Sequence, residues 1–86
     1  MKHASPTALD ALEPLLAELR ALAGLTERSR GVFYRRGRAF LHFHEDPKGL
    51  FADLRDPGGL DFERFDVTDG SGSTNVLAAA RARLAL

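Results

Sequence analysis

The stretch AFLHFHEDPKGLFADL, residues 39–54, decides the fold of this chain. At its centre the segment DPKG, residues 46–49, has Asp, Pro and Gly at the first, second and fourth places of a type I turn. The residues on both sides of this turn are rich in aromatic and aliphatic side chains, which favour strands. The stretch therefore predicts a β-hairpin, with one strand over 39–44 and the next over 50–54.

The segments on either side of this hairpin predict two further strands. Residues 32–34 are aromatic and β-branched, and the turn at 35–38 contains Gly37, which can adopt a positive φ. Residues 60–67 form the fourth strand, after the breaker DPGG at 56–59. Strands joined by tight turns indicate an antiparallel sheet of four strands.

A helix is predicted at each end of the chain. Ser5 and Pro6 are a start signal, and leucines then recur at three- and four-residue spacings. Because Pro14 removes a backbone N–H, we expect a short leading turn and a main helix over 12–23, which Gly24 ends in a left-handed conformation. The last helix is expected to be capped by Ser73 or Thr74.

The predicted fold class is therefore α+β: helix, four-stranded antiparallel sheet, helix, with both amphipathic helices on one face of the sheet. The 86 residues predict a single domain, in which 1–11 and 68–74 are expected to be flexible. The other face of the sheet has no element left to cover it. We call this surface the open face.

Composition narrows the class of protein. Cysteine is absent, which excludes disulfides and thiolate metal sites, and the start of the chain has no apolar segment of the kind a signal peptide needs. No stretch is apolar enough to span a membrane. We therefore expect a cytoplasmic protein without a membrane partner, and the excess of Arg, Ala, Leu and Gly is typical of a GC-rich bacterial genome.

The net charge is zero, but the charges are segregated along the sequence. Residues 28–42 carry five arginines and no acid, whereas residues 43–70 carry an excess of acids. We therefore expect a dipolar molecule. Its zero net charge argues against strong steering toward nucleic acid.

Strand alternation predicts which residues lie on the open face. In strand 39–44 one set, expected under the helices, is apolar: Ala39, Leu41 and Phe43. The other set is expected on the open face: Phe40, His42 and His44. With two-residue turns, Phe33 pairs with Phe40, and Asp53 and Phe51 lie near the histidines. With a glycine bulge at 46–49, Leu50, Ala52 and Leu54 join the histidine face instead.

Two imidazoles on one strand face are suited to binding a metal. His42 and His44, with Asp46 if the strand continues that far, would supply a set of nitrogen and oxygen ligands for zinc or non-haem iron. The alternatives are a half-exposed histidine pair with no ligand, and a pair that binds an anion or titrates at an interface. The pattern alone assigns no cofactor.

The first hairpin has a basic tip with Arg35, Arg36 and Arg38. Together with the aromatic residues Phe33 and Phe40, these arginines could hold a small anionic ligand or stack on the bases of a nucleic acid. The alternative is a solvated turn.

No catalytic residue is identified, because no nucleophile is paired with a base in the sequence. The preferred hypothesis is a non-catalytic binding or interaction domain that uses the open face, including as a homodimer. The alternatives are nucleic-acid binding through the arginine hairpin and a metal-dependent enzyme that uses His42 and His44.

Residues 31–54 resemble a segment of small bacterial proteins of unknown function and, more loosely, of the YjbR-like family, which has a frataxin-like fold. In this comparison Gly31, Phe33 and Phe40 match the family's glycine and aromatic positions around a basic hairpin tip. The resemblance implies a helix–sheet–helix order. The chain is shorter than that family and lacks its tryptophan-containing final strand, and the family's DNA-binding label transfers to no residue here.

Overall fold

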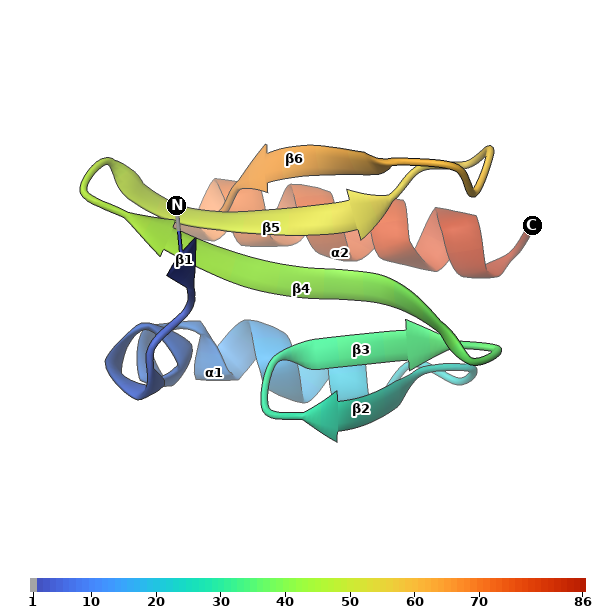
Figure 1. Cartoon of the computed structure of the whole chain (residues 1–86), viewed down its shortest axis with the longest axis horizontal. Helices are drawn as coiled ribbons and strands as arrows, with labels where there is room; N and C mark the ends of the chain where they lie inside the picture. Colours follow the sequence, from blue (N-terminus) through green and yellow to red (C-terminus); the bar gives the residue numbers. More distant parts are fainter. Residues whose placement is uncertain (1) are drawn as a thin grey trace.

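The computed structural model describes residues 2–86 of the chain, and it contains six strands and two helices (Figure 1). In chain order the elements are β1 (Lys2–His3), α1 (Pro6–Arg20), β2 (Thr26–Ser29), β3 (Val32–Arg35), β4 (Arg38–Asp46), β5 (Gly49–Arg55), β6 (Phe62–Asp66) and α2 (Gly70–Leu84). No helix within this range is long and apolar enough to cross a bilayer.

The strands form one antiparallel sheet in the order β2-β3-β4-β5-β6. Strand β1 pairs with β4 near the end of β4, where His3 lies opposite His44, and β3 pairs with the first half of β4. The α+β class and the antiparallel sheet are thus confirmed, but the expectation of four strands was wrong. The two extra strands are β1, which has only two residues, and β2, whose sequence TERS lacks apolar residues.

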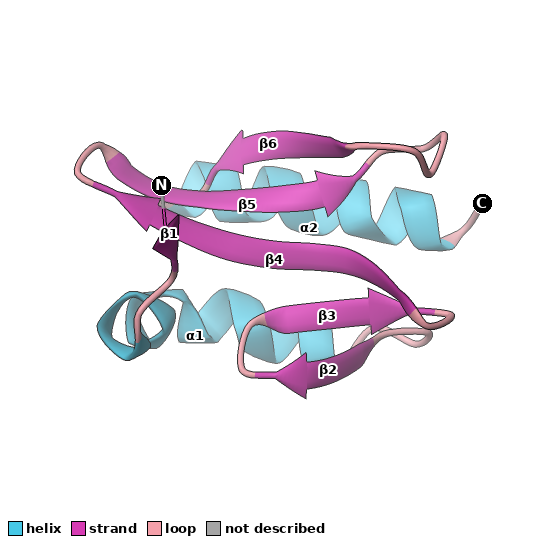
Figure 2. Ribbon diagram, in the orientation of Figure 1, coloured by secondary structure: helices cyan, strands magenta, loops and turns pink. Residues whose placement is uncertain are grey.

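Both helices lie behind the sheet in the view of Figure 2, so they cover the same face. The reason is the leucine pattern of α1 and the apolar stripe of α2, which pack against the inward-facing residues of the strands. Leu16, Leu19, Leu41, Leu54 and Val76 are fully buried in this core. The opposite face of the sheet is the open face.

Both helix boundaries differ from the sequence prediction. Helix α1 is continuous from Pro6 to Arg20 and includes Pro14, so the proline does not divide it. Ser5 caps it as expected, since its hydroxyl accepts from the Ala8 N–H at 3.3 Å. Gly24 has the predicted positive φ, +94°, but it lies beyond the end of the helix.

Helix α2 begins earlier than predicted because a carboxylate caps it. Oδ1 of Asp69 accepts hydrogen bonds from the backbone N–H groups of Ser71 and Gly72, both at 3.1 Å. The cap is therefore neither Ser73 nor Thr74. The two segments expected to be flexible, 1–11 and 68–74, include β1, the start of α1 and the first turn of α2.

Strand β4 contains an irregularity that moves Phe40 to the helix side. Phe33 pairs with Leu41 and the next residue, Tyr34, pairs with Ala39, so Phe40 has no partner in β3. This is the pattern of a β-bulge. Phe40 is 3% exposed and belongs to the core. The prediction that Phe40 lies on the open face, opposite Phe33, was wrong.

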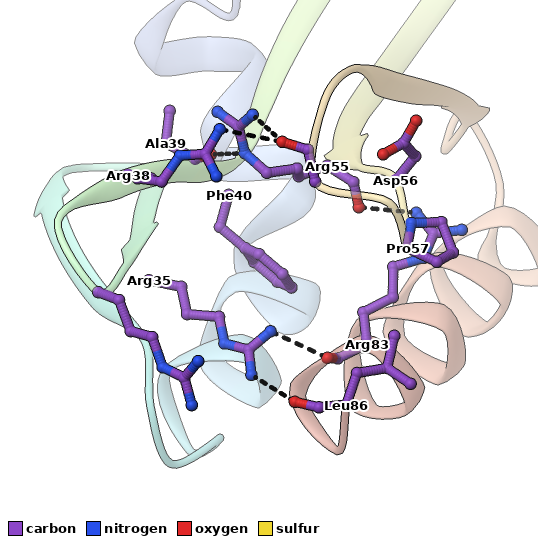
Figure 3. Close-up of a pocket in the computed structure, with 11 residues that line it drawn as sticks. Arg35, Arg38, Ala39, Phe40, Arg55, Asp56, Pro57, Arg83 and Leu86 are labelled. Atoms are coloured by element: carbon purple, nitrogen blue, oxygen red, sulfur yellow. Dashed lines mark hydrogen bonds between the residues drawn. The ribbon is translucent and has the colours of Figure 1, made fainter.

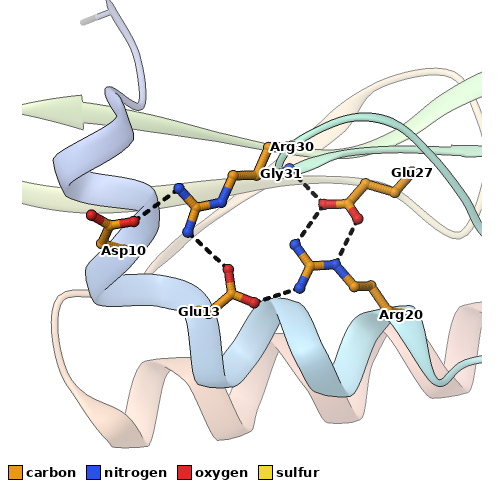
Figure 4. A network of polar contacts seen from close by, with 6 residues as sticks. All are labelled: Asp10, Glu13, Arg20, Glu27, Arg30 and Gly31. Carbon is orange, nitrogen blue, oxygen red and sulfur yellow. Dashed lines mark hydrogen bonds and ion pairs between the residues drawn. The ribbon is translucent and has the colours of Figure 1, made fainter.

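The charge segregation of the sequence is partly cancelled in three dimensions (Figure 4). Arg30, which follows β2, forms ion pairs with Asp10 at 2.9 Å and Glu13 at 2.8 Å on α1. Arg20 pairs with Glu13 and, at 2.6 Å, with Glu27 of β2. This network joins α1 to the β2–β3 hairpin, so one of the five arginines of 28–42 is neutralised by acids from elsewhere in the chain.

Candidate metal site on the open face

The site is built on the two central strands of the sheet. His42 and His44 alternate on β4, and the register of the β4–β5 hairpin places Asp53 directly opposite His42. Of the two registers considered for this hairpin, the one with a two-residue turn is therefore confirmed. Asp53 is the only polar residue among the buried ones in the described chain, with 7% exposure.

Three side chains converge there: His42, His44 and Asp53, which we call the triad. Nδ1 of His42 lies 2.9 Å from Nε2 of His44. The same Nε2 lies 3.3 Å from Oδ2 of Asp53. One ligand atom from each of the three residues can be chosen so that all lie within 4.8 Å of one another.

The Asp53 carboxylate also contacts Arg64, and this contact fixes its orientation. Arg64 of β6, which pairs with Asp53 in the sheet, donates from Nε to Oδ1 at 2.7 Å and from its terminal nitrogen to Oδ2 at 2.8 Å. This bidentate contact lowers the pKa of the Asp53 carboxyl, against the effect of burial, so the group is ionised at neutral pH.

The two imidazoles are held in the neutral form. Burial lowers the pKa of His42, and the neighbouring His44 lowers it further. Burial also lowers the pKa of His44, although the Asp53 carboxylate acts in the opposite direction. Neutral imidazoles and an ionised carboxylate are the protonation states in which these groups bind metals.

Aromatic and basic side chains surround the triad. The ring of His3, on β1, stacks on that of His44 with centroids 4.9 Å apart. The ring of Phe62, on β6, meets His42 edge-on at 5.0 Å, and the Arg55 guanidinium lies 4.6 Å above Phe62. With these neighbours, His42 and His44 remain partly exposed on the open face, whereas Asp53 is buried.

The spacing of the triad suits a tetrahedral metal. Zinc bound at about 2.0–2.1 Å holds neighbouring ligand atoms about 3.3–3.4 Å apart. The separations of 2.9 and 3.3 Å around His44 are close to this spacing, whereas all three ligand atoms lie within 4.8 Å of one another, so the His42 ring and the Asp53 carboxylate have to approach each other when an ion binds. Two imidazoles and one carboxylate also form the ligand set of non-haem iron sites.

Sequence reasoning found part of this site. It identified His42 and His44, but named Asp46 as the oxygen ligand, and Asp46 does not belong to the triad. Asp46 instead accepts a hydrogen bond from the Lys48 N–H at 2.7 Å, as the first residue of its turn. Asp53 depended on a hairpin register that the sequence left open.

The other predicted binding residues lie apart from the triad. Phe33 is buried in the core with 1% exposure, as Phe40 is. Arg35, Arg36 and Arg38 line a pocket at the other end of β4, together with Arg55 and Arg83, which the sequence analysis did not select.

Comparison with protein-family models, with curated proteins and with solved structures found no match to this chain. The resemblance to the YjbR-like family therefore stays a prediction.

Proposed function

We propose that this protein is a small binding domain whose open face chelates one divalent transition-metal ion, with zinc as the best fit, through His42, His44 and Asp53. The observation that carries the proposal is the convergence of these three side chains from two paired strands. His44 lies 2.9 Å from His42 and 3.3 Å from Asp53, and the three ligand atoms lie within 4.8 Å of one another, so one ion can contact all three.

The protonation states support the proposal. A metal binds neutral imidazoles and ionised carboxylates, so protons compete with it at low pH. The lowered pKa values of both histidines and of Asp53 extend the metal-binding protonation states to lower pH. Arg64 has two opposite effects: it orients the carboxylate, as partners of metal ligands do, and its positive charge opposes a cation.

Three protein ligands leave one tetrahedral position for water or for an atom of a partner. Because the triad lies on the open face, a second molecule can reach this position. A homodimer or another partner held at this face stays a prediction, and so does catalysis by the bound metal.

Calorimetric titration of zinc chloride into metal-free protein at pH 7.5 tests the proposal. We expect one site per chain, with His42→Ala, His44→Ala and Asp53→Asn each weakening zinc at least tenfold. His42 and His44 are partly exposed, and Asp53→Asn keeps the shape of the buried side chain and one acceptor oxygen for Arg64, so circular dichroism is expected to show a folded chain in each variant.

The matched control is Asp46→Asn. An asparagine oxygen can still accept from the Lys48 N–H, so this variant removes a charge near the triad without removing a ligand. We expect it to bind zinc within about twofold of the wild-type protein. Equal losses for Asp46→Asn and Asp53→Asn would indicate general electrostatic attraction in place of chelation, and would refute the proposal.

A further inference from the structure

A cavity of about 160 Å³ lies where the β3–β4 hairpin, the end of β5 and the end of α2 meet (Figure 3). Five arginines line it: Arg35, Arg36, Arg38, Arg55 and Arg83. Its apolar lining residues are Ala39, Phe40, Pro57 and Leu86. We call it the arginine pocket. It lies at the tip of the β3–β4 hairpin, and Arg55 connects it to the surroundings of the triad, since this side chain also lies over Phe62.

Neutral backbone acceptors hold the guanidinium groups in place. Arg38 and Arg55 both donate to the carbonyl oxygen of Gly59, at 2.9 and 3.1 Å. Arg55 also donates to the Ala39 carbonyl at 2.7 Å. Figure 3 shows these groups at one side of the cavity and the Arg35 group at the other. One carbonyl oxygen thus holds two positively charged guanidinium groups close together, and this arrangement favours the binding of an anion next to them.

Arg35 is anchored on the last turn of α2. Its guanidinium donates to the carbonyls of Arg83, Leu84 and Leu86 at 3.0, 3.3 and 3.2 Å. Arg83 and Leu84 are the last two residues of α2, so the positive charge lies at the negative end of the helix dipole. An anion in the cavity is therefore shielded from the carbonyls of α2.

The charge of the pocket is not balanced by acids. Among residues 2–86 only Arg83 of the five forms an ion pair, with Glu63. Asp56 also lines the pocket, but its Oδ1 accepts from the Leu60 N–H at 3.2 Å. Arg35, Arg36, Arg38 and Arg55 therefore have no Asp or Glu ion-pair partner among residues 2–86, and Asp56 is the one carboxylate side chain that lines the cavity with the five guanidinium groups.

The backbone of Arg36 also points to a function for this pocket. Its φ is +54°, and it is the one non-glycine residue of the described chain with a positive φ. With Gly37 at +81° it occupies the first central place of the hairpin turn, where Asn, Asp or Gly is favoured. A left-handed arginine costs about 1 kcal/mol. Such strain points to a function for the side chain, which lines the pocket.

We propose that the arginine pocket binds the phosphate group of a small phosphomonoester. A phosphate dianion offers several oxygens to guanidinium groups that approach from both sides, whereas a carboxylate offers two. The cavity is smaller than the roughly 300–1,000 Å³ of pockets that enclose a whole ligand. It therefore takes the phosphate and the atoms next to it, which contact the apolar residues, and the rest of the ligand stays outside.

Nuclear magnetic resonance titration of the labelled protein with phenyl phosphate, inorganic phosphate and benzoate tests this site. We expect saturable shifts of the amides of 35–40, 56, 58 and 59 and of the arginine side chains of the pocket. Phenyl phosphate is expected to bind most tightly and benzoate at least tenfold more weakly. Equal affinity for benzoate and phenyl phosphate, or the absence of saturable shifts, would overturn the proposal.

A pair of short single-stranded oligonucleotides, with and without a 5′-phosphate, distinguishes a terminal phosphomonoester from the phosphodiester backbone of a nucleic acid. The proposal expects the oligonucleotide without a terminal phosphate not to bind in the pocket. Equal and steeply salt-dependent binding of both strands would assign the arginines to nucleic-acid backbone instead.

Variants separate ligand binding from stability. Arg36→Asn relieves the strained turn, so we expect a higher unfolding midpoint together with at least fivefold weaker phenyl phosphate. Arg38→Gln is expected to weaken the ligand similarly. Arg81→Gln is the matched control, because Arg81 is exposed on α2 and is not among the residues lining the pocket. A loss in Arg81→Gln as large as in Arg38→Gln would indicate net charge alone and refute the site.

Discussion

Asp53 links the two histidines of β4 to the edge strand β6. Its carboxylate is nearly buried, and it accepts from Arg64 on one side while it lies 3.3 Å from His44 on the other. A buried carboxylate is tolerated only with such partners. The residue that completes the candidate metal site is therefore also one that the sheet must satisfy in order to fold.

The histidines make the stability of the metal-free protein depend on pH. The pKa values of His42 and His44 are lowered in the folded chain, whereas the unfolded chain holds both near about 6.5. As the pH falls through that value, the unfolded chain takes up more protons, so the free energy of unfolding decreases. Urea unfolding with a chelator should show a decline from pH 7.5 to 5.5, at most about 1.4 kcal/mol per pH unit per histidine.

The control for this measurement is the double variant His42→Gln, His44→Gln, which should be nearly insensitive to pH over the same interval. The lowered pKa of Asp53 keeps that group ionised there, so it contributes no slope. A wild-type protein whose unfolding free energy is the same at pH 7.5 and 5.5 would show that the imidazoles are not held neutral.

For single residues, the sequence predicted the positions of the two histidines but not those of Phe40 and Asp53. Strand alternation alone places His42 and His44 on one face, and the structure agrees. Phe40 was misplaced because a bulge interrupts alternation, and nothing local in the segment marks the bulge. Asp53 required the pairing register, which depends on contacts between strands that composition does not show.

At the scale of elements, the approach of α2 to the sheet depends on one glycine. A Cβ atom built on Gly72 would lie 1.9 Å from the backbone oxygen of Asp66, at the end of β6. The backbone must move to accept any side chain there. The GSGS segment, which the sequence analysis expected to be a flexible link, is therefore the first turn of a helix packed closely on a strand.

This contact predicts different effects for two neighbouring glycines. Gly72→Ala should lower the free energy of unfolding by at least about 2 kcal/mol, as overpacking does. Gly70→Ala should leave it unchanged or raise it by up to about 1 kcal/mol, because a Cβ at Gly70 meets nothing within 4 Å and alanine favours the helix. Urea unfolding measures both, and equal effects would contradict the packing of α2 on β6.

The hairpin of β4 and β5 was predictable because its turn residues and strand residues agree on one structure. The first helix was predicted as a short leading turn and a main helix over 12–23, but α1 is continuous from Pro6, since its leucines bury enough apolar surface to outweigh the hydrogen bond lost at Pro14. Strand β2 was missed because its residues are polar, and its pairing with β3 is a property of the assembled sheet.

For the molecule as a whole, the structure places two candidate sites on a single long strand. The histidines of the triad lie at the middle and in the second half of β4, and the arginine pocket surrounds its first half. The ion-pair network of Figure 4 neutralises Arg30, whereas of the five arginines of the pocket only Arg83 has an acidic partner among the described residues, Glu63. The charge asymmetry that the sequence shows as a run of residues is thus concentrated at one end of β4.

The central claim is that His42, His44 and Asp53 bind one metal ion together. X-ray absorption at the zinc edge of the one-to-one complex tests it most directly, because the spectrum reports the ligand atoms themselves. We predict four-coordinate zinc with two imidazole nitrogens at about 2.0–2.1 Å and at least one carboxylate oxygen. A spectrum of oxygen ligands without imidazole, or of a single imidazole, would contradict it.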